Sequence, residues 1–380
     1  MRIGIDGGCW GNRRGYGRFL RELLAALSRA GGDHQYSIFL DSIAARDFPE
    51  DLRVARIIVP TSQSVDAAAT AESRRSVSDL LRMSRAVAGT PLDLFFFPSV
   101  YSYFPLLNRV PMLLGVHDTM ADSNPQYAFA TRREQFYWDS KVRLAIFQCD
   151  AILTVSEYSR RCVAEHLRVG SKPIHVVTEG ASSKFRSKPV SPPVTPFILY
   201  VGGISPSKNL DTLIKAFSRT KARQRLELWL AGDYQNDRFK SSYQALRALV
   251  QELELDSRVR FTGFVPDERL CTLYNQASLF VMPSLDEGFG LPALEAMSSG
   301  APVVVSRGNA LEEVVGDAGL VVDPHDQTAL AEAMDGIVAD SGYAAELGRG
   351  SLRRAAGFSW DASARRFLDV VEHMRRRGGE

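Results

Sequence analysis

The chain of 380 residues is 45% hydrophobic, which suits two globular domains of ordinary size. Its 46 basic and 44 acidic residues nearly cancel, so composition gives no electrostatic case for a nucleic-acid partner. The four cysteines have no paired spacing, which speaks against a zinc motif or a disulfide frame and favours a reducing cytosol. The first residues lack the apolar core of a signal peptide, and no apolar run is as long as a membrane helix, so we expect a soluble or peripheral protein.

The first half of the chain alternates short apolar strands with amphipathic helices. Strands are predicted at residues 2–5, 36–40, 54–59, 92–97, 112–116, 151–155 and 174–178. Helical spacing of apolar residues predicts helices at 19–27, 71–88, 131–149 and 158–166, with Ser156 as the N-cap of the last one. This alternation is typical of a parallel sheet that is covered by helices on both faces.

Two segments of this half carry further signals. Gly15 and Gly17 fall in a polar loop before the first helix, in a spacing that does not match a dinucleotide fingerprint. They either line a binding site or form a plain turn into the helix. The helix at 71–88 carries four arginines: Arg74, Arg75, Arg82 and Arg85. It is either an ordinary solvated face or a contact for an anionic membrane or a lipid-linked acceptor.

His117 and Asp118 stand directly beyond the strand at 112–116. Ligands of parallel α/β sheets bind outside the carboxyl ends of the strands, so His117 is a candidate site residue. The alternative is a structural histidine that ends a strand.

A change of composition marks the middle of the chain. Residues 184–196 contain four prolines and little apolar material, which is typical of a linker. We therefore expect an N-terminal domain at 1–186, a linker at 187–196 and a C-terminal domain at 197–358. Strands of the second domain are predicted at 197–201, 226–231, 259–264, 279–282, 302–305 and 320–322, and a final amphipathic helix at 360–377.

Lys208 lies at the start of a predicted helix, directly after the strand at 197–201 and the glycines Gly202 and Gly203. A cation at this end opposes the helix dipole by roughly 0.3 to 1 kcal/mol. A bound diphosphate would reverse that penalty, so the position favours an anionic ligand.

The chain's most informative stretch is Glu287-Gly288-Phe289-Gly290-Leu291-Pro292, between the strand at 279–282 and a helix. Pro292 suits the first helical position, which places the cap on Leu291, a residue without a side-chain acceptor. The helix amides therefore stay free, and Gly288 and Gly290 allow another group to approach the backbone closely. This pattern predicts a phosphate site, and its alternative is a tight Gly-Pro turn.

Glu287 and Glu295, with seven residues between them, flank the loop and can hydrogen-bond the hydroxyls of a sugar or ribose. Together with the loop and the later Ala318-Gly319, they resemble the signature of family-four retaining glycosyltransferases of the GT-B architecture. The resemblance covers nearly the whole chain and is strongest from about Val201 to Pro324. It implies an α/β fold with two Rossmann-like, doubly wound parallel-sheet domains facing across a cleft. The last segment, 359–380, is then expected to pack back on the N-terminal domain.

The resemblance also implies an activity. The C-terminal domain would bind a nucleoside diphosphate sugar, either GDP-mannose-like or a UDP-sugar, and the N-terminal domain would bind the acceptor. The sugar would pass, with retention of configuration, to a hydroxyl of a glycan, a lipid-linked molecule or a small molecule, in polysaccharide or glycolipid assembly. No cofactor or metal is expected, and the chain has no D-x-D triplet of the kind that holds a metal ion in other transferases. The expected location is the cytoplasm or the inner membrane face.

Site roles follow from the same resemblance. His117 would face the transferred sugar, Lys208 would contact the donor phosphates, Glu287 would orient the donor sugar and Glu295 the ribose. The remaining donor-binding positions are Gly15, Gly17, Gly203, Gly288, Phe289, Gly290 and Leu291.

The chain departs from the family pattern twice. The family often has an arginine near the position of Gly203, and it often has Pro-Asn-Gly where this chain has Thr178-Glu179-Gly180.

We expect a same-face route, in which the leaving phosphate accepts the proton of the acceptor. A double displacement would instead need a carboxylate nucleophile, for which Asp118 is a candidate. Two other functions remain open. One is an epimerase or phosphorylase on the same architecture, and the other is a non-catalytic subunit that binds nucleotide sugars.

Overall fold

The computed structural model describes residues 1–380 except 13–14, 63–75, 235–240 and 378–380. Arg74 and Arg75 of the predicted basic helix thus lie outside the described residues. The chain forms two compact units, Met1–Glu179 with Trp360–Glu380, and Gly180–Ser359. No helix in the described ranges combines the length and the apolar character that crossing a bilayer requires.

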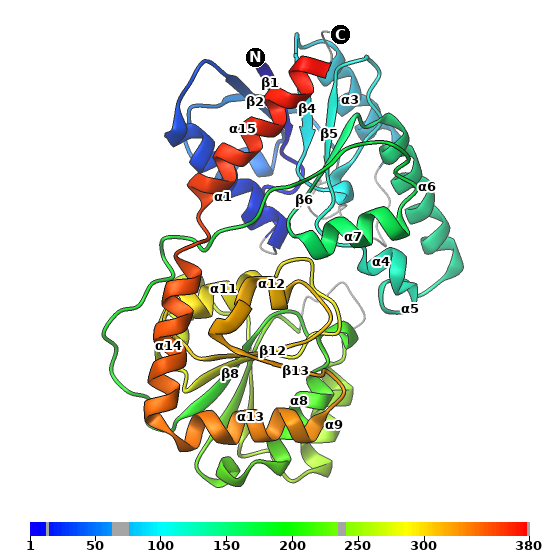
Figure 1. Ribbon diagram of the computed structural model, residues 1–380. Helices are drawn as coiled ribbons and strands as arrows, with labels where there is room; N and C mark the ends of the chain where they lie inside the picture. Colours follow the sequence, from blue (N-terminus) through cyan, green and yellow to red (C-terminus); the bar gives the residue numbers. More distant parts are fainter. Residues whose placement is uncertain (13–14, 63–75, 235–240, 378–380) are drawn as a thin grey trace. The chain divides into compact units, whose positions relative to one another are not determined.

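The first unit is built on a seven-stranded sheet in which all pairs are parallel (Figure 1). Its strand order is β3-β2-β1-β4-β5-β6-β7. The strands are β1 (Arg2–Asp6), β2 (Gln35–Asp41), β3 (Ala55–Val59), β4 (Leu94–Phe97), β5 (Met112–Gly115), β6 (Ala151–Thr154) and β7 (Ile174–Val176). The helices are α1 (Gly15–Ala30), α3 (Val77–Ala88), α4 (Met120–Ser123), α5 (Pro125–Ala128), α6 (Arg132–Gln148), α7 (Glu157–His166) and α15 (Trp360–Arg377).

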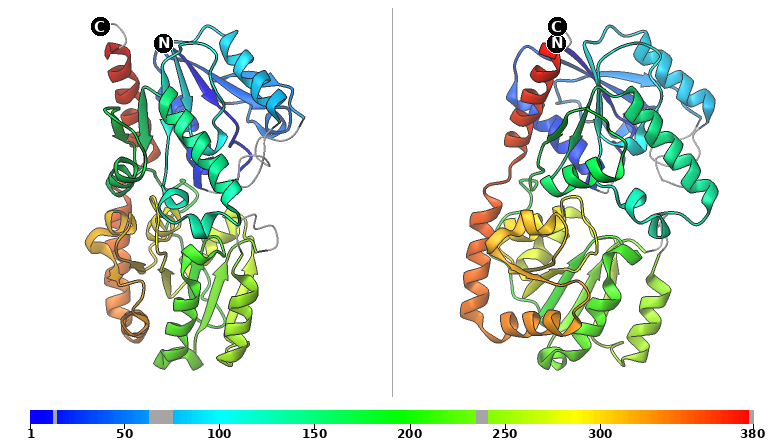
Figure 2. Two further views of the ribbon diagram at one scale, coloured as in Figure 1. Left: turned by 90° about the vertical axis from the view of Figure 1, so that its right-hand side faces the viewer. Right: turned by 45° about the vertical axis from the view of Figure 1, so that its right-hand side comes forward.

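Helices cover both faces of this sheet because alternate residues of each strand point to opposite sides. Phe96 packs against Phe367 of α15, with 5.0 Å between the ring centroids. Its neighbours Phe95 and Phe97 pack on the other face, in the same apolar cluster as α3 and α6. Figure 2 accordingly shows α15 on one side of the first sheet and α3 and α6 on the other.

The predicted polar loop at Gly15 to Arg18 is wrong, because helix α1 already begins at Gly15. Gly17 is buried, and a Cβ there would lie 2.0 Å from the carbonyl oxygen of Asn12. The close approach of the helix to this carbonyl therefore requires glycine, despite its low helix propensity. At Gly15, by contrast, an added Cβ meets no described atom within 4 Å.

The second unit contains a six-stranded parallel sheet with the order β10-β9-β8-β11-β12-β13. The strands are β8 (Phe197–Val201), β9 (Glu227–Ala231), β10 (Val259–Gly263), β11 (Leu279–Met282), β12 (Val303–Ser306) and β13 (Leu320–Val322). The helices are α8 (Leu210–Arg219), α9 (Tyr243–Glu252), α10 (Asp267–Gln276), α11 (Leu291–Ser298), α12 (Leu311–Val315), α13 (Gln327–Ala339) and α14 (Ser341–Ala355). The order corresponds to the 3-2-1-4-5-6 arrangement of a doubly wound sheet.

The proline-rich segment that was expected to link the domains is part of the second unit. The side chain of Asn275 on α10 accepts from the amide of Lys188 (2.8 Å) and donates to the carbonyl of Arg186 (3.0 Å). The next residue, Gln276, donates to the carbonyl of Ser191 (2.8 Å). These bonds hold the segment along α10, within the second unit, Gly180–Ser359.

Candidate functional site

The candidate site of the second unit lies where the strand order of its sheet reverses. Strand β8 pairs with β9 on one side and with β11 on the other. In open parallel α/β sheets, ligands bind beyond the carboxyl ends of the strands at such a switch point. Lys208 follows β8 and Glu287 follows β11, so the fold brings these two predicted site residues to that point.

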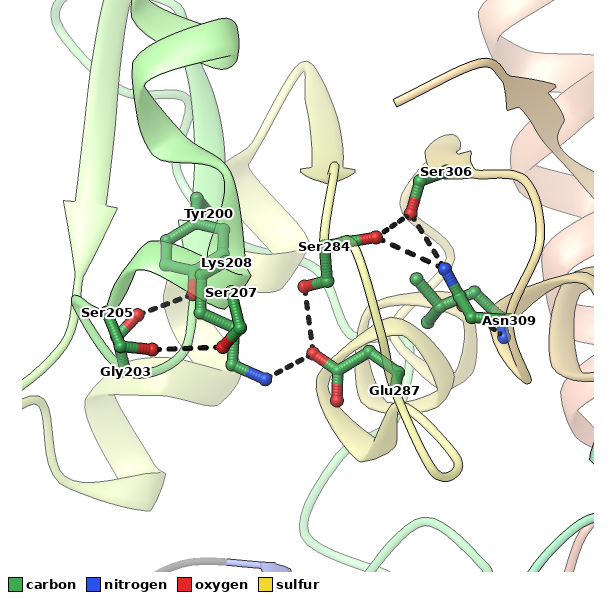
Figure 3. Close-up of polar contacts among 10 residues, drawn as sticks. Tyr200, Gly203, Ser205, Ser207, Lys208, Ser284, Glu287, Ser306 and Asn309 are labelled. Carbon is green, nitrogen blue, oxygen red and sulfur yellow. Dashed lines mark hydrogen bonds and ion pairs between the residues drawn. The ribbon is translucent and has the colours of Figure 1, made fainter. Parts of the chain in front are cut away.

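Lys208 and Glu287 form an ion pair, with 2.6 Å between Nζ and Oε1 (Figure 3). Their side chains are 22% and 13% exposed, so the pair is partly shielded from water. The same Oε1 atom accepts a hydrogen bond of 2.8 Å from Ser284 Oγ. Because the ammonium group keeps some exposure, it is able to contact a bound anion while the carboxylate holds it in place.

Neighbouring segments hold the loop that follows β11. The carbonyl oxygen of Ser284 accepts hydrogen bonds from Ser306 Oγ and from Asn309 Nδ2, which belong to the segment around the end of β12. The amide of Leu285 donates to the carbonyl of Ser207 after β8 (2.9 Å). The loop is therefore tied to the segments on both sides, which fixes the position of its acidic side chain.

Asn209 is a structural residue of the site that the motifs did not indicate. Its backbone is left-handed, with φ 57°, and its side-chain amide donates to the carbonyls of Pro283 (3.0 Å) and Pro324 (2.7 Å). It thereby joins the segments after β8, β11 and β13. Asparagine tolerates the left-handed conformation, and its side-chain amide has two hydrogens to donate. An asparagine directly after Lys208 is therefore the sequence signal that could have indicated this role.

Helix α11 begins one residue earlier than predicted. Its capping residue is Gly290, with φ 97°, and not Leu291. The left-handed conformation of the glycine explains the shift, because it turns the chain into the helix before Pro292. No side chain in the described part of the chain caps α11. Pro292 has no amide hydrogen, and the amides of Ala293 and Leu294 donate to the carbonyl of Gly290 (2.9 and 3.3 Å). The predicted phosphate contact therefore falls to the backbone amides before Pro292.

The two apolar residues of the glycine loop point into the second unit. Phe289 and Leu291 are buried, and the ring of Phe289 packs edge-on against Phe358 at 5.9 Å. These two positions can therefore meet a donor through backbone groups rather than side chains. Gly288 and Gly290 have no side chain to shield that backbone, which keeps the predicted cradle compatible with the observed packing.

Glu295 and Gly203 also lie in the second unit. The carboxylate of Glu295 is 2% exposed and accepts a hydrogen bond of 3.1 Å from Tyr274 Oη. The carbonyl of Gly203 accepts from Tyr200 Oη (2.7 Å), and a Cβ at Gly203 would meet no described atom within 4 Å. The predicted contacts of Glu295 with a ribose, and of Gly203 with the donor, stay predictions.

In the first unit, His117 is held by four segments that are distant from it in sequence. Its Nε2 atom lies 2.8 Å from the carbonyl oxygen of Pro98, and its Nδ1 atom lies 3.4 Å from Glu179 Oε1. Ser159 Oγ donates to the carbonyl of His117 (2.8 Å), and the ring of Phe19 packs edge-on at 4.7 Å. Sequence reasoning identified His117 but not these partners, because they come from the segments after β4 and β7 and from α1 and α7.

Ser156 caps α7 as predicted, since its side chain accepts from the amide of Ser159 (2.9 Å). The carboxylate of Asp118, the candidate nucleophile of a double displacement, accepts from the amide of Met120 (3.1 Å).

Over the described ranges, no group of three or more histidine, cysteine, aspartate or glutamate residues is arranged to hold a metal ion. The roles of Gly15 and Gly17 toward a donor stay predictions.

Comparison with known families divides the chain within a few residues of the boundary between its two structural units at Glu179 and Gly180. Residues 13–183 match the family Glycosyltransferase Family 4, and residues 182–354 match Glycosyl transferases group 1. The O-antigen chain mannosyltransferase B of Escherichia coli is 36% identical over 263 residues, which are 64% of this chain and 66% of that protein. The chain spans 45 or 46% of three longer mannosyltransferases from the same organism.

Solved structures match nearly the whole chain. The sucrose-phosphate synthase of Thermosynechococcus elongatus has a TM-score of 0.77 at 22% identity, with 98% of this chain and 99% of that chain covered. The Anabaena protein HepE, solved in complex with UDP-glucose, has a TM-score of 0.75 at 17% identity, with 98% and 100% covered. At these identities the likeness shows the fold, which is that of two parallel-sheet α/β domains of the GT-B architecture.

Proposed function

Because the chain belongs to the glycosyltransferases of family 4 and group 1, we propose that it transfers a sugar from a nucleoside diphosphate sugar to a hydroxyl acceptor. The proposal includes retention of configuration and independence of metal. Similarity to an E. coli mannosyltransferase favours mannose, and hence a GDP-mannose donor, with a UDP-sugar as the alternative. The acceptor is a glycan, a lipid-linked molecule or a small molecule, and the place of action is the cytoplasm or its membrane face.

The ion pair of Lys208 and Glu287 at the switch point of the second sheet is the observation that carries this proposal. A cation next to the amino terminus of α11, which no described side chain caps, offers a diphosphate a charged contact and the positive end of a helix dipole. In the proposed complex, Lys208 and the amides around Gly290 stabilise the charge on the leaving diphosphate. Glu287 orients the sugar hydroxyls, and Glu295 the ribose.

The chemical step is a same-face displacement. The bond between the anomeric carbon and the diphosphate oxygen breaks while the bond to the acceptor oxygen forms. The acceptor's proton passes to an oxygen of the leaving diphosphate, so the step needs no protein base. His117 contacts the transferred sugar in this proposal.

Thermal unfolding of the purified chain with GDP, UDP, ADP, dTDP and CMP, each with and without magnesium, tests the proposal. A nucleotide at 100 times its dissociation constant adds about 2.7 kcal/mol of stability, so one nucleoside diphosphate is expected to raise the midpoint without metal. Transfer assays with the matching sugar nucleotide follow. No shift with any nucleotide would contradict the proposal, and turnover that needs free phosphate would favour a phosphorylase.

We place the proposed membrane contact on helix α6 rather than on the predicted basic helix at 71–88, because the described part of the first unit exposes Phe136, Tyr137 and Phe147 on α6. Its outward face carries the exposed side chains of Phe136, Tyr137, Leu144 and Phe147, interleaved with Arg133 and Arg143. The two acidic residues of the helix are half-buried, so its exposed face combines apolar and basic character. Aromatic rings enter the interface of a bilayer and arginines bind anionic headgroups, so an anionic lipid surface is the partner that fits.

Vesicle sedimentation tests this contact. We expect the chain to sediment with phosphatidylglycerol vesicles more than with phosphatidylcholine vesicles, and less as salt is raised, because salt screens the arginines. The double variant Phe136→Ser/Phe147→Ser should lose most of this binding. Phe264→Ser, which removes an exposed ring of the second unit, is the matched control. Equal sedimentation of both variants would contradict the proposed contact.

A further inference from the structure

Glu179, one of the two residues at which the chain departs from the family's Pro-Asn-Gly, is a buried acid. It follows β7, and its side chain is 4% exposed. The turn that carries it is held from two sides. The amide of Val177 donates to the carbonyl of Thr154 on β6 (2.8 Å), and Ser363 Oγ of α15 donates to the carbonyl of Thr178. The carboxylate therefore occupies a fixed place in the first unit.

A carboxylate this deeply buried is costly unless it has polar or charged partners. One of its partners is the His117 ring, whose Nδ1 atom lies 3.4 Å from Glu179 Oε1. The two residues come from the ends of β5 and β7, which both pair with β6. The sheet thus places an acid beside a histidine that is proposed to contact the sugar.

The other ring nitrogen of His117 is also engaged. A carbonyl oxygen accepts hydrogen bonds but cannot donate them, so the Nε2 atom, 2.8 Å from the Pro98 carbonyl, carries a hydrogen. The Nδ1 atom faces the Glu179 carboxyl group. Both ring nitrogens of His117 thus face oxygen atoms of the protein. This holds whether a proton between Nδ1 and the carboxyl group is bonded to the nitrogen or to the oxygen. The edge-on ring of Phe19 further restricts the imidazole.

We propose that Glu179 is a positioning residue for His117, and that the pair makes His117 an oriented contact for the sugar rather than the base of the reaction. The inference rests on the proposed function. It is consistent with the same-face route, in which the acceptor's proton goes to the leaving diphosphate and His117 neither takes nor gives a proton. Glu179 would keep the imidazole in one orientation while the acceptor oxygen replaces the diphosphate oxygen at the anomeric carbon.

Steady-state kinetics of Glu179→Ala, Glu179→Gln, His117→Ala and Glu179→Ala/His117→Ala test the inference. Glu179→Ala should lower kcat about tenfold and change the donor KM less than about twofold. Without Glu179 the His117 imidazole is no longer fixed, and this affects the chemical step more than it affects donor binding. Glu179→Gln keeps a hydrogen-bonding group of the same length and should stay within about threefold of the wild-type kcat. In the His117→Ala background, Glu179→Ala should have no further effect, because residues that act as a unit are not additive.

Asp79→Ala is the matched control. Asp79 is another buried acid of the first unit, and its carboxylate accepts from the amide and hydroxyl of Ser62 (3.0 and 2.6 Å). This variant should lose thermal stability but keep kcat.

Two results would overturn the inference: a wild-type kcat in Glu179→Ala, or a full additional loss when Glu179→Ala is combined with His117→Ala. Failure of the proposed function would look different. The wild-type chain would then show neither sugar transfer nor a shift of its thermal midpoint with any nucleotide. If the wild type transfers sugar and Glu179→Ala does so equally well, the inference alone is wrong.

Discussion

Replacing Lys208 by alanine should lower kcat/KM for the sugar nucleotide by at least about tenfold, which corresponds to about 1.4 kcal/mol of barrier. The substitution removes the cation proposed to stabilise the diphosphate. It also leaves the Glu287 carboxylate, which is 13% exposed, without its partner at 2.6 Å. That carboxylate would then repel the diphosphate, so calorimetry should show weaker nucleoside diphosphate binding.

The double variant Lys208→Ala/Glu287→Gln separates the two causes. Its neutral amide removes the repulsion, so it should bind the nucleoside diphosphate more tightly than Lys208→Ala does. Glu287→Gln alone should lower turnover, because Glu287 is proposed to orient the sugar. Lys215→Ala is the matched control, since this lysine pairs with Asp211 at the surface of α8. Full activity of Lys208→Ala would show that the donor phosphates bind elsewhere.

Gly17→Ala should lower the free energy of unfolding by about 1 to 3 kcal/mol, the usual cost of forcing extra atoms into a packed site. The new Cβ would lie 2.0 Å from the carbonyl oxygen of Asn12, and a backbone atom cannot move aside as a flexible side chain does. The start of α1 would have to move away from that segment. Urea unfolding of the purified variant measures the effect.

Gly15→Ala tests the same chemical change two residues earlier in α1. No described atom lies within 4 Å of the added Cβ, and alanine favours helices by about 0.8 to 1 kcal/mol over glycine, so stability should be unchanged or slightly higher. If both variants unfolded at the same urea concentration, the close contact at Gly17 would not constrain the helix.

The strands of both sheets were predictable because each parallel strand is a short apolar run. The start of α1 could not be predicted in this way, because Gly15 and Gly17 favour a loop when only local preference is considered. In the fold, Gly17 lies in the helix because only glycine fits so close to the Asn12 carbonyl. The prolines at 184–196 favour a linker when only local preference is considered. The hydrogen bonds that hold this segment come from Asn275 and Gln276, on a helix later in the chain.

Sequence patterns indicate the candidate site residues one at a time, but they do not indicate how these residues are arranged. Lys208 and Glu287 are 79 positions apart, and only the adjacency of β8 and β11 brings them to 2.6 Å. The loop motif identifies Glu287 and the helix start identifies Lys208, yet neither pattern indicates that they pair. The contact of Glu179 with His117 could not be predicted from the sequence either, because it depends on the order of β5, β6 and β7 in the sheet.

Helix α15 is the last helix of the chain, yet it completes the core of the first unit, where Phe367 packs on Phe96. During synthesis, residues 1–179 emerge from the ribosome long before this helix does, and domains tend to fold as they emerge. The second unit, Gly180–Ser359, is continuous in sequence and is fully synthesised before Trp360 is added. The unit that is translated first is therefore the one that finishes folding last.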